Sequence, residues 1–290
     1  MGRRRLVLVG AGGMLGSMVA RHVPPEYELL PCTRFDLDLT DPTQVEETLR
    51  RLAPAVIINC AAFTNVDACE TQEALATRVN GDGPGHLART AHRLGAVLVH
   101  VSTDYVFDGQ QERPYGEDDP PNPQSAYGRS KRAGEEAILA SGLERWFIVR
   151  TSWLYGPGGK NFVETILRLA QEREELRVVA DQIGTPTYSD DLAGAIFRLV
   201  PTDAFGIYHV SGQGECSWYE FACEIVAQFV QRGGRAKVKK IVPISTAEYP
   251  LPAARPAYSV FAKDKYEAAV GAVLPPWRES LARYFASRPA

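Results

Sequence analysis

The stretch Leu6-Val7-Leu8-Val9-Gly10-Ala11-Gly12-Gly13-Met14-Leu15-Gly16 decides the fold class. A short, unbroken apolar run is typical of a strand buried on both faces, and the glycines after it suit a tight turn into a helix. Gly10 permits the turn, Gly13 lets the backbone approach a pyrophosphate, and Gly16 allows close packing of helix on strand. We therefore expect a dinucleotide to contact Gly10, Gly13, Met14, Leu15 and Gly16 at the start of the helix, where phosphate groups are favoured. A plain strand-to-helix turn is the alternative.

Short apolar runs recur further along the chain, at residues 56–58, 97–99 and 147–149, with stretches of helical spacing between them. Strands that alternate with helices in this way are joined by right-handed crossovers. The pattern predicts an α/β fold, with a doubly wound, Rossmann-like parallel sheet covered by helices on both faces.

The regular alternation weakens beyond about residue 150, where prolines become more frequent. We expect residues 1–152 to form a dinucleotide-binding domain, with segments near 184–210 returning to it. Residues 153–290 would then form mainly a smaller C-terminal lobe that binds the substrate.

Composition narrows the class of protein. The chain has 290 residues, of which 45% are hydrophobic and 23% charged, and this is ordinary for a globular protein with a sizeable core. A net charge of -3 argues against a nucleic-acid polymer as partner. No stretch approaches the roughly 20 apolar residues that span a bilayer, and the first apolar run is too short for a secretion signal. Five scattered cysteines without Cys-x-x-Cys spacing fit a reducing, cytoplasmic location and no metal site.

Local signals place two helix starts and one long loop. Asp41-Pro42 supplies a capping carboxylate and a proline at the first helical position. Ser217 and Glu220 have the spacing of a capping box. The stretch from Asp108 to Ser125 is rich in Pro, Gly, Asn and acidic residues, which predicts a long surface loop, and such loops in compact domains are usually functional.

The second strand, near Glu28 to Cys32, should end beside the adenosine ribose of the dinucleotide. An acidic residue there favours NAD, whereas an arginine tolerates a 2′-phosphate. Arg34 comes first after this strand, so we expect NADPH, with NADH and a merely solvated arginine as the alternatives. The remaining expected cofactor contacts are Asp38, Leu39, Ala61, Ala62 and Thr64.

Tyr127 and Lys131 are four residues apart and share one face if this segment is a helix. Reduction of a ketone needs a proton for the oxygen that hydride attack leaves negatively charged. We expect Lys131 to favour the phenolate of Tyr127, whose ordinary pKa is about 10, and to hold the cofactor ribose. Hydroxyls of Ser102 or Thr103, at the carboxyl end of a buried strand, could polarise the carbonyl. Tyr-x-x-x-Lys is common by chance, and an exposed pair is the alternative.

Taken together, the motifs resemble the extended short-chain dehydrogenase/reductases, and within them the dTDP-4-dehydrorhamnose reductase family. The segments that carry the resemblance run along most of the chain: Gly10 to Gly16, Ala61 to Asp67, Ser102 to Phe107, Tyr127 to Lys131, Arg150 to Trp153, Asn161-Phe162, Asp181 to Thr187 and Arg255-Pro256.

The resemblance implies hydride transfer from NADPH to the 4-keto carbon of dTDP-4-dehydro-L-rhamnose, giving dTDP-L-rhamnose. It implies that Thr103 bonds the keto oxygen, that Tyr127 donates the proton, and that Lys131 grips the ribose. The substrate contacts that it implies are Ser102, Thr103, Asp104, Tyr105, Trp153, Asn161, Gln182 and Arg255, the last at the diphosphate. Structural alternatives are a core position for Trp153, a helix cap for Asn161 and a turn around Gln182.

Three positions depart from the family's pattern. Some bacterial members bind magnesium through glutamates at a dimer interface, one of them two residues after the third glycine. Met18 stands there, so we expect no metal, and a homodimer stays open. Phe63 replaces a frequent Tyr or His, and Phe261 replaces an aliphatic residue, which leaves the precise sugar nucleotide open. Two alternative functions are a related nucleotide 4-keto-sugar reductase and a non-catalytic, NADP-binding regulatory subunit.

Overall fold

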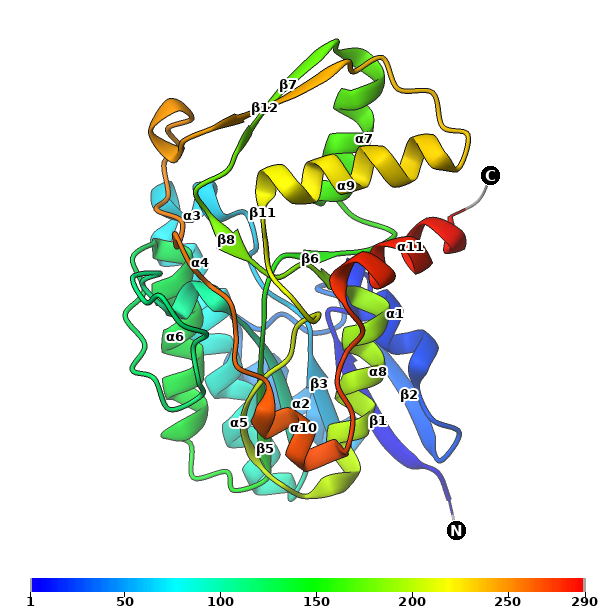
Figure 1. Cartoon of the computed structure of the whole chain (residues 1–290). Helices are drawn as coiled ribbons and strands as arrows, with labels where there is room; N and C mark the ends of the chain where they lie inside the picture. The colour runs from blue at the N-terminus through cyan, green and yellow to red at the C-terminus, as the bar shows by residue number, and fades with distance from the viewer. Residues whose placement is uncertain (1, 289–290) are drawn as a thin grey trace.

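Six parallel strands form the central sheet in this computed structural model, which describes residues 2–288 (Figure 1). Their order across the sheet is β10-β5-β4-β3-β1-β2. The chain therefore passes from β1 outward to β2 and then returns to the other side of β1, which creates a topological switch point between β1 and β3. The strand bounds are β1 Arg4–Val9, β2 Tyr27–Cys32, β3 Val56–Asn59, β4 Val97–Thr103, β5 Trp146–Thr151 and β10 Gly206–His209.

Helices cover both faces of this sheet, so the expected doubly wound fold is confirmed. Helices α1 and α8 pack against each other on one face, and α2, α5 and α6 lie along the other. The helix bounds are α1 Met14–His22, α2 Pro42–Leu52, α5 Gly83–Leu94, α6 Ala126–Leu139 and α8 Ser189–Leu199.

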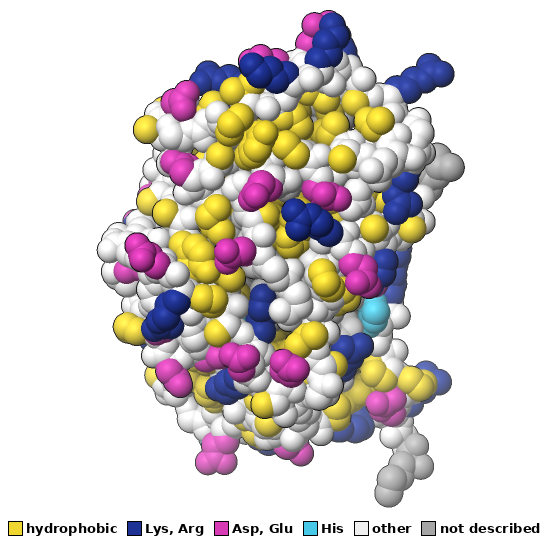
Figure 2. All heavy atoms as spheres, viewed as in Figure 1, with side chains coloured by type: hydrophobic (Ala, Val, Ile, Leu, Met, Phe, Trp, Pro, Cys, Tyr) yellow, Lys and Arg dark blue, Asp and Glu magenta, His cyan; other side chains and the backbone are white. Residues whose placement is uncertain are grey.

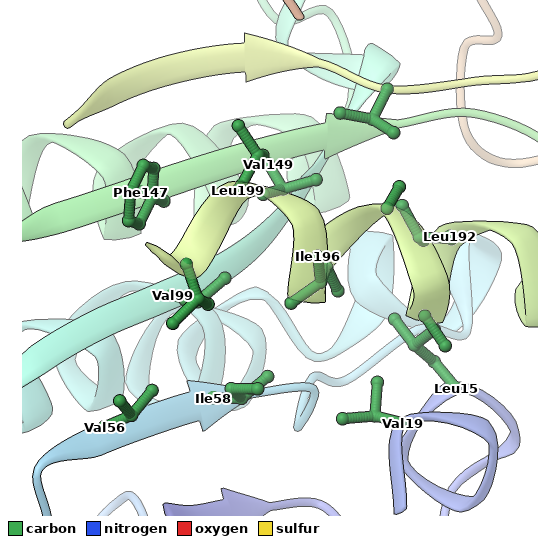
Figure 3. Close-up of a cluster of buried hydrophobic side chains, with 14 of the residues drawn as sticks. Leu15, Val19, Val56, Ile58, Val99, Phe147, Val149, Leu192, Ile196 and Leu199 are labelled. Carbon is green, nitrogen blue, oxygen red and sulfur yellow. The ribbon is translucent and has the colours of Figure 1, made fainter. Parts of the chain in front are cut away.

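The core on the α1 and α8 face explains why the apolar runs are continuous. Side chains of β3, β4 and β5 alternate between the two faces, and those shown in Figure 3 pack against Leu15 and Val19 of α1 and against Leu192 and Ile196 of α8. Met18 is also buried in this core, so the position where the resemblance expects a metal-binding glutamate faces apolar side chains. Each such side chain stabilises the fold by about 1.5–3 kcal/mol when fully buried.

A second group of elements lies beyond the carboxyl ends of the sheet strands (Figure 1). Helices α7, α9 and α11 share a separate core that includes Tyr155, Phe221 and Trp277. The elements of this region are β6 Leu154–Tyr155, α7 Phe162–Glu172, β7 Glu175–Val179, β8 Ile183–Gly184, β9 Thr187–Tyr188, β11 Cys216–Ser217, α9 Trp218–Gln231, β12 Lys240–Ile244 and α11 Trp277–Ser287. Strand β7 pairs with β12, β8 with β11, and β6 with β9.

Short helices complete the chain. A run of helical turns follows β3, and it contains a π-helical segment at Arg78–Asp82. Such segments are rare and often mark functional sites. The bounds are α3 Val66–Thr71, α4 Glu73–Thr77, η1 Arg78–Asp82, η2 Asp104–Val106, η3 Val200–Thr202, η4 Thr246–Glu248 and α10 Asp264–Val270.

The predicted helix starts are confirmed. The carboxylate of Asp41 accepts from the backbone N–H groups of Thr43 and Gln44, and Pro42 occupies the first helical position of α2. Ser217 and Glu220 form the expected reciprocal capping box at α9. The stretch between η2 and α6 is an extended loop, as its composition predicts.

On the face shown in Figure 2, acidic and basic side chains are interspersed, and apolar side chains gather over α9. Along α9, Tyr219, Cys223 and Val226 are half-buried, and Val230 is exposed. Within residues 2–288, no helix has both the length and the apolar character that crossing a membrane requires.

Candidate active site

The glycine turn lies at the switch point of the sheet and is built by close backbone approaches. Gly10 has a φ of +79°, and a Cβ atom there would lie 2.7 Å from the backbone nitrogen of Ala61, which follows β3. A Cβ atom on Gly16 would overlap the carbonyl oxygen of Gly10. These contacts require glycine at both positions, and they place Ala61, which precedes Ala62, directly beside the turn.

The N-terminus of α1 is suited to phosphate groups. Gly13 is its N-cap residue, and no side chain in the described part of the chain makes a capping hydrogen bond at this helix end. The first N–H groups of a helix have no partner within the helix, and together with the helix dipole they attract anions. The residues present therefore fit a pyrophosphate that would be held by the backbone N–H groups of Met14 and Leu15, because the N–H of Gly13 already donates to the carbonyl oxygen of Gly10.

The side chains of Met14 and Leu15 point in different directions. Leu15 is only 6% exposed and belongs to the core under the sheet, so only its backbone faces the expected cofactor (Figure 3). Met14 contacts the loop before α7. Its sulfur lies 3.7 Å from the side-chain nitrogen of Asn161, and a Cβ atom added to Gly159 would lie 3.2 Å from the Cβ atom of Met14. Loop 156–161, which precedes α7, therefore packs against the first residue of α1.

Both acidic and basic side chains lie near the end of β2, where the adenosine ribose is expected. Arg34 is exposed there. The carboxylate of Asp38 accepts hydrogen bonds from the backbone N–H and hydroxyl of Thr40, and these bonds, together with Arg34 and Arg78, lower its pKa. Arg78 was not predicted from the sequence, and two cations beside one carboxylate suit a 2′-phosphate.

The other expected contacts of the adenosine half differ in exposure. Leu39 is buried, and its carbonyl oxygen is bonded to His86 Nδ1. A Cβ atom on Gly83 would press against Leu39, so α5 packs closely beneath it. Thr64 is exposed in the segment between β3 and α3. Leu39 can thus offer only an apolar surface, whereas the Thr64 hydroxyl is accessible to a ligand.

Thr103 and Tyr127 meet at the carboxyl end of β4. Thr103 is the last residue of the strand, and its hydroxyl oxygen lies 3.0 Å from Asp104 Oδ1 and accepts from the backbone N–H of Tyr105. Tyr127 lies in the first turn of α6, with its ring edge-to-face against that of Tyr105 at 5.4 Å between centroids. Gly128 makes this approach possible, because a Cβ atom there would overlap the carbonyl oxygen of Tyr105.

The phenol of Tyr127 is not made more acidic, which corrects the expectation from the sequence. Burial raises its pKa, the Thr103 hydroxyl opposes this effect, and Asp104 and Cys69 raise the pKa further. No hydrogen bond among residues 2–288 joins the side chains of Tyr127 and Lys131. Tyr127 therefore keeps its proton at neutral pH, which is the state that a proton donor needs.

Lys131 is buried behind Tyr127 on the same helix. Its Nζ atom donates to the carbonyl oxygen of Val101 at 2.7 Å and lies 3.1 Å from His100 Nε2. Burial lowers the pKa of Lys131 to about 8, although Glu135 and Cys60 act in the opposite direction. Four residues of helix place Lys131 and Tyr127 on one face, as predicted, but β4 supplies the hydrogen-bond partners of Lys131.

Ser102 is a further correction, because its hydroxyl donates to Glu135 at 2.6 Å. Glu135 is also held at two points by Arg150, with contacts of 2.9 and 2.7 Å, and both charged side chains are almost completely buried. Successive side chains of a strand point to opposite faces, so Ser102 faces inward to α6 while Thr103 reaches the end of the sheet. We withdraw Ser102 as a candidate substrate contact.

Asp104 is a buried carboxyl group with an unused acceptor. Among residues 2–288 its Oδ2 atom has no hydrogen-bond partner, and the residue is only 2% exposed. Burial raises its pKa to about 6, although Ser259 and Thr103 lower it. An unpaired oxygen in this position is a candidate acceptor for a ligand hydroxyl group.

Trp153 forms an aromatic layer with a residue that sequence reasoning missed. Its backbone has a φ of +47°, which is uncommon for a bulky residue and is often found at functional sites. Its ring stacks on Trp218 at 3.4 Å between centroids, and a Cβ atom on Gly184 would lie 2.5 Å from it. The structure thus holds Trp153 in one orientation, partly exposed beyond the end of β5.

Asn161 and Gln182 use their side chains within the protein. Asn161 caps α7 by accepting from Glu164, and its amide nitrogen donates to the carbonyl oxygen of Gly156. Gln182 is buried and donates to the Thr246 hydroxyl at 2.9 Å. The helix-cap alternative therefore describes the contacts of Asn161, whereas Gln182 is held by a long-range hydrogen bond and not by a local turn.

Arg255 reaches the site from the C-terminal part of the chain. Its guanidinium group forms two 2.8 Å hydrogen bonds with Asp67 of α3. It also lies close enough to the phenol of Tyr105 for that group to raise the pKa of Arg255. Arg255 and Tyr105 are therefore neighbours, although 150 positions of sequence separate them.

A hollow lined by Pro42, Glu46 and Arg50 lies on α2 and includes none of the candidate site residues.

Several site residues could not be found from local motifs. Asn80, in the π-helical segment, accepts from the backbone N–H of Phe63 through its amide oxygen. Its amide nitrogen donates to the carbonyl oxygen of Phe63 and to the Ser130 hydroxyl of α6. Asn59 and His100 contact each other inside the sheet. The only sequence signal for Asn59 and His100 is that each is a polar residue within or next to an apolar strand run. Within residues 2–288, no cluster of three or more His, Cys, Asp or Glu side chains is arranged to hold a metal ion.

Comparison with known proteins agrees with this geometry. The family described as the RmlD substrate binding domain matches residues 4–288. The chain is 43% identical to the spore coat polysaccharide biosynthesis protein SpsK of Bacillus subtilis over 285 residues, with 98% of each chain covered. It is 41% identical to the dTDP-4-dehydrorhamnose reductase of Burkholderia thailandensis, covering 94% of this chain and 95% of that one.

A solved structure extends the similarity to three dimensions. The dTDP-4-dehydrorhamnose reductase of Bacillus anthracis, in complex with NADP, superimposes with a TM-score of 0.93 at 42% identity, covering 99% of this chain and all of that one. The glycine turn, the Thr103 and Tyr127 pair and the sheet define an NAD(P)H-dependent oxidoreductase with the extended short-chain dehydrogenase fold. Within that class, the chain belongs to the RmlD, or dTDP-4-dehydrorhamnose reductase, family.

Proposed function

We propose that this protein reduces the 4-keto group of dTDP-4-dehydro-L-rhamnose to give dTDP-L-rhamnose. The observation that carries the proposal is the meeting of Thr103 and the protonated Tyr127 at the carboxyl end of the sheet. NADPH would supply the hydride, and NADH is the alternative donor. The arginines near Asp38 and the NADP found with the Bacillus anthracis relative support NADPH.

Tyr127 would donate the proton to the former keto oxygen. Its raised pKa keeps the phenol protonated at neutral pH, and an alkoxide is a stronger base than a phenolate, so transfer of this proton is favourable. The Thr103 hydroxyl would hydrogen-bond the same oxygen. To do so it must rotate away from Asp104, with which it now shares a 3.0 Å contact.

The remaining contacts would bind and orient the sugar nucleotide. The unpaired oxygen of Asp104 would accept from a sugar hydroxyl group, and Trp153 would cover the sugar ring. Arg255, held in place by Asp67, would meet the diphosphate, for which a guanidinium group is well shaped. We propose that residues 1–152 and the segments near 184–210 hold the dinucleotide, and that the rest of the chain mainly holds the sugar nucleotide.

A substrate panel tests the proposal. Purified protein is mixed with NADPH and either dTDP-4-dehydro-L-rhamnose or another nucleotide 4-keto sugar, and loss of reduced nicotinamide is followed by its absorbance. We expect the rhamnose precursor to give the highest kcat/KM. Turnover of another nucleotide sugar alone would support the related-reductase alternative, which the 43% identity with the differently named SpsK also favours. Cofactor binding without turnover of any sugar would support the regulatory subunit instead.

A further inference from the structure

His100 is a fully buried side chain of β4 for which the proposed reaction has no role. Its two ring nitrogens each face a polar partner. Nδ1 lies 3.0 Å from the side-chain nitrogen of Asn59, and Nε2 lies 3.1 Å from Lys131 Nζ. The ring therefore connects the end of β3, beside the glycine turn, with the lysine of the candidate active site.

The orientation of the Asn59 amide group is determined by the backbone. The N–H of Ala61 donates to Asn59 Oδ1 at 3.0 Å. A backbone N–H can only donate, so the acceptor must be the amide oxygen, and the NH2 group of Asn59 is left facing His100. Because an NH2 group has only donors to offer, His100 Nδ1 must be the unprotonated acceptor.

A neutral imidazole ring with Nδ1 unprotonated carries its proton on Nε2. That N–H points at Lys131 Nζ. An ammonium group has three donors and no acceptor, so two donors would face each other if Lys131 were charged. A neutral amine has a lone pair for the Nε2–H, and it keeps an N–H for the carbonyl oxygen of Val101.

We propose that His100 is a positioning residue for Lys131: by donating from Nε2 it orients Nζ and favours the neutral amine of Lys131 in the cofactor-free protein at mildly alkaline pH. Uptake of a proton from solvent converts this amine to an ammonium group, which cannot accept from His100. Protonation of Lys131 therefore breaks the bond to His100, whereas the ammonium group can still donate to the carbonyl oxygen of Val101. The inference deepens the proposed function and rests on it only for the part that Lys131 plays in turnover.

The charged and titratable groups around Lys131 favour its ammonium form less than burial opposes it. Glu135, on the same helix, is paired with Arg150, so much of its charge is already balanced. Burial raises the pKa of Cys60, which follows β3, to about 12, and this thiol is therefore neutral. Burial, with a smaller effect of Lys131, lowers the pKa of His100 well below its usual value.

The protonation state of His100 can be read directly in the cofactor-free full chain. Long-range proton–nitrogen NMR spectra of protein labelled with ¹⁵N-histidine distinguish the two neutral tautomers and the charged ring. The His100 signals are identified by their loss in His100→Gln. We expect the neutral Nε2–H tautomer at mildly alkaline pH, above the midpoint at which Lys131 loses its proton. A proton on Nδ1, whether in the other tautomer or in a charged ring, would overturn the proposal.

Titration of Lys131 gives the second measurement, in protein labelled with ¹³C at lysine Cε. The Lys131 signal is assigned with Lys131→Met, and its midpoint should lie near pH 8. In His100→Gln, the amide oxygen can accept from an ammonium group, so the midpoint should rise by about one pH unit or more. Lys263 is the control in the same spectra, because burial also lowers its pKa to about 8 and it donates to Gly212, away from His100.

An unchanged Lys131 midpoint in folded His100→Gln would refute the proposal. Should that variant not fold, Asn59→Ala serves instead. Without the amide NH2 group, the His100 proton can move to Nδ1 and Nε2 can accept from Lys131, so the same upward shift is expected. Both measurements omit the sugar nucleotide, so a failure to reduce dTDP-4-dehydro-L-rhamnose leaves their outcome unaffected.

Discussion

Arg255 and Asp67 form a two-point ion pair, with distances of 2.8 Å from Nη1 to Oδ1 and from Nη2 to Oδ2. Arg255 comes from the C-terminal part of the chain and Asp67 from α3, after the third strand of the sheet. The pair lowers the pKa of Asp67, chiefly through the hydrogen bonds from Arg255. It brings a cation, already oriented, next to Tyr105.

Replacing this cation should weaken binding of the sugar nucleotide. Charge-assisted hydrogen bonds contribute about 1.5–3 kcal/mol, so Arg255→Ala should raise the KM for the substrate by roughly 10-fold or more. The dissociation constant of NADPH, measured by fluorescence titration, should change little. Arg177→Ala, which removes an exposed ion pair with Glu248, is the matched control. A larger effect on NADPH than on the sugar nucleotide would remove Arg255 from the substrate site.

Tyr127→Phe should separate catalysis from binding. The variant keeps the ring against Tyr105 and loses only the hydroxyl group that donates the proton. General acid catalysis contributes about 10²–10⁴-fold, so kcat should fall by about 10²-fold or more while NADPH affinity is retained. Tyr249→Phe, at an exposed tyrosine, should be fully active. A wild-type rate in Tyr127→Phe would contradict the assigned role.

Cofactor preference should depend on Arg34. An exposed arginine beside Asp38 can pair with the 2′-phosphate of NADPH, which NADH lacks. Arg34→Ala should therefore raise the KM for NADPH by about 10-fold, on the scale of one charged hydrogen bond, and leave the KM for NADH nearly unchanged. Arg168→Ala, at an exposed helix pair, provides the control. Equal changes for both cofactors would point to a loss of local structure instead.

The buried carboxyl group of Asp104 should make stability depend on pH in an unusual direction. Its pKa is raised by burial to about 6 in the folded protein, from 3.8. The folded state therefore binds this proton more tightly than the unfolded state does. The resulting stabilisation is complete below pH 3.8 and is lost as the pH rises through about 6.

The variant Asp104→Asn tests this linkage, because its amide group does not titrate. The Asp104 proton should contribute about 1 kcal/mol more to the wild-type free energy of unfolding at pH 5 than at pH 8. The variant should thus gain stability relative to wild type at pH 8 and lose part of this advantage at pH 5, as measured by urea denaturation. A difference between the two proteins that is independent of pH would show that Asp104 does not titrate in this range.

Much of the fold follows from local patterns. Continuous apolar runs predict buried parallel strands, and the observed β1, β3, β4 and β5 contain the runs at 6–9, 56–58, 97–99 and 147–149. Asp41 and Ser217 mark helix starts because a cap is made within three residues of sequence. Sequence reasoning erred at Ser102, where the alternation of side chains along β4 turns its hydroxyl group toward Glu135.

What the sequence by itself determined is the set of short-range features: the glycine turn, the strand runs, and the placing of Tyr127 and Lys131 on one helix face. Backbone geometry repeats over two to four residues, so such features can be deduced without knowing the rest of the chain. Only the tertiary structure decided the protonation of the site. The pKa of a buried group depends on desolvation and on neighbours from other elements, so His100 opposite Lys131 and burial around Tyr127 reversed the expectation drawn from spacing.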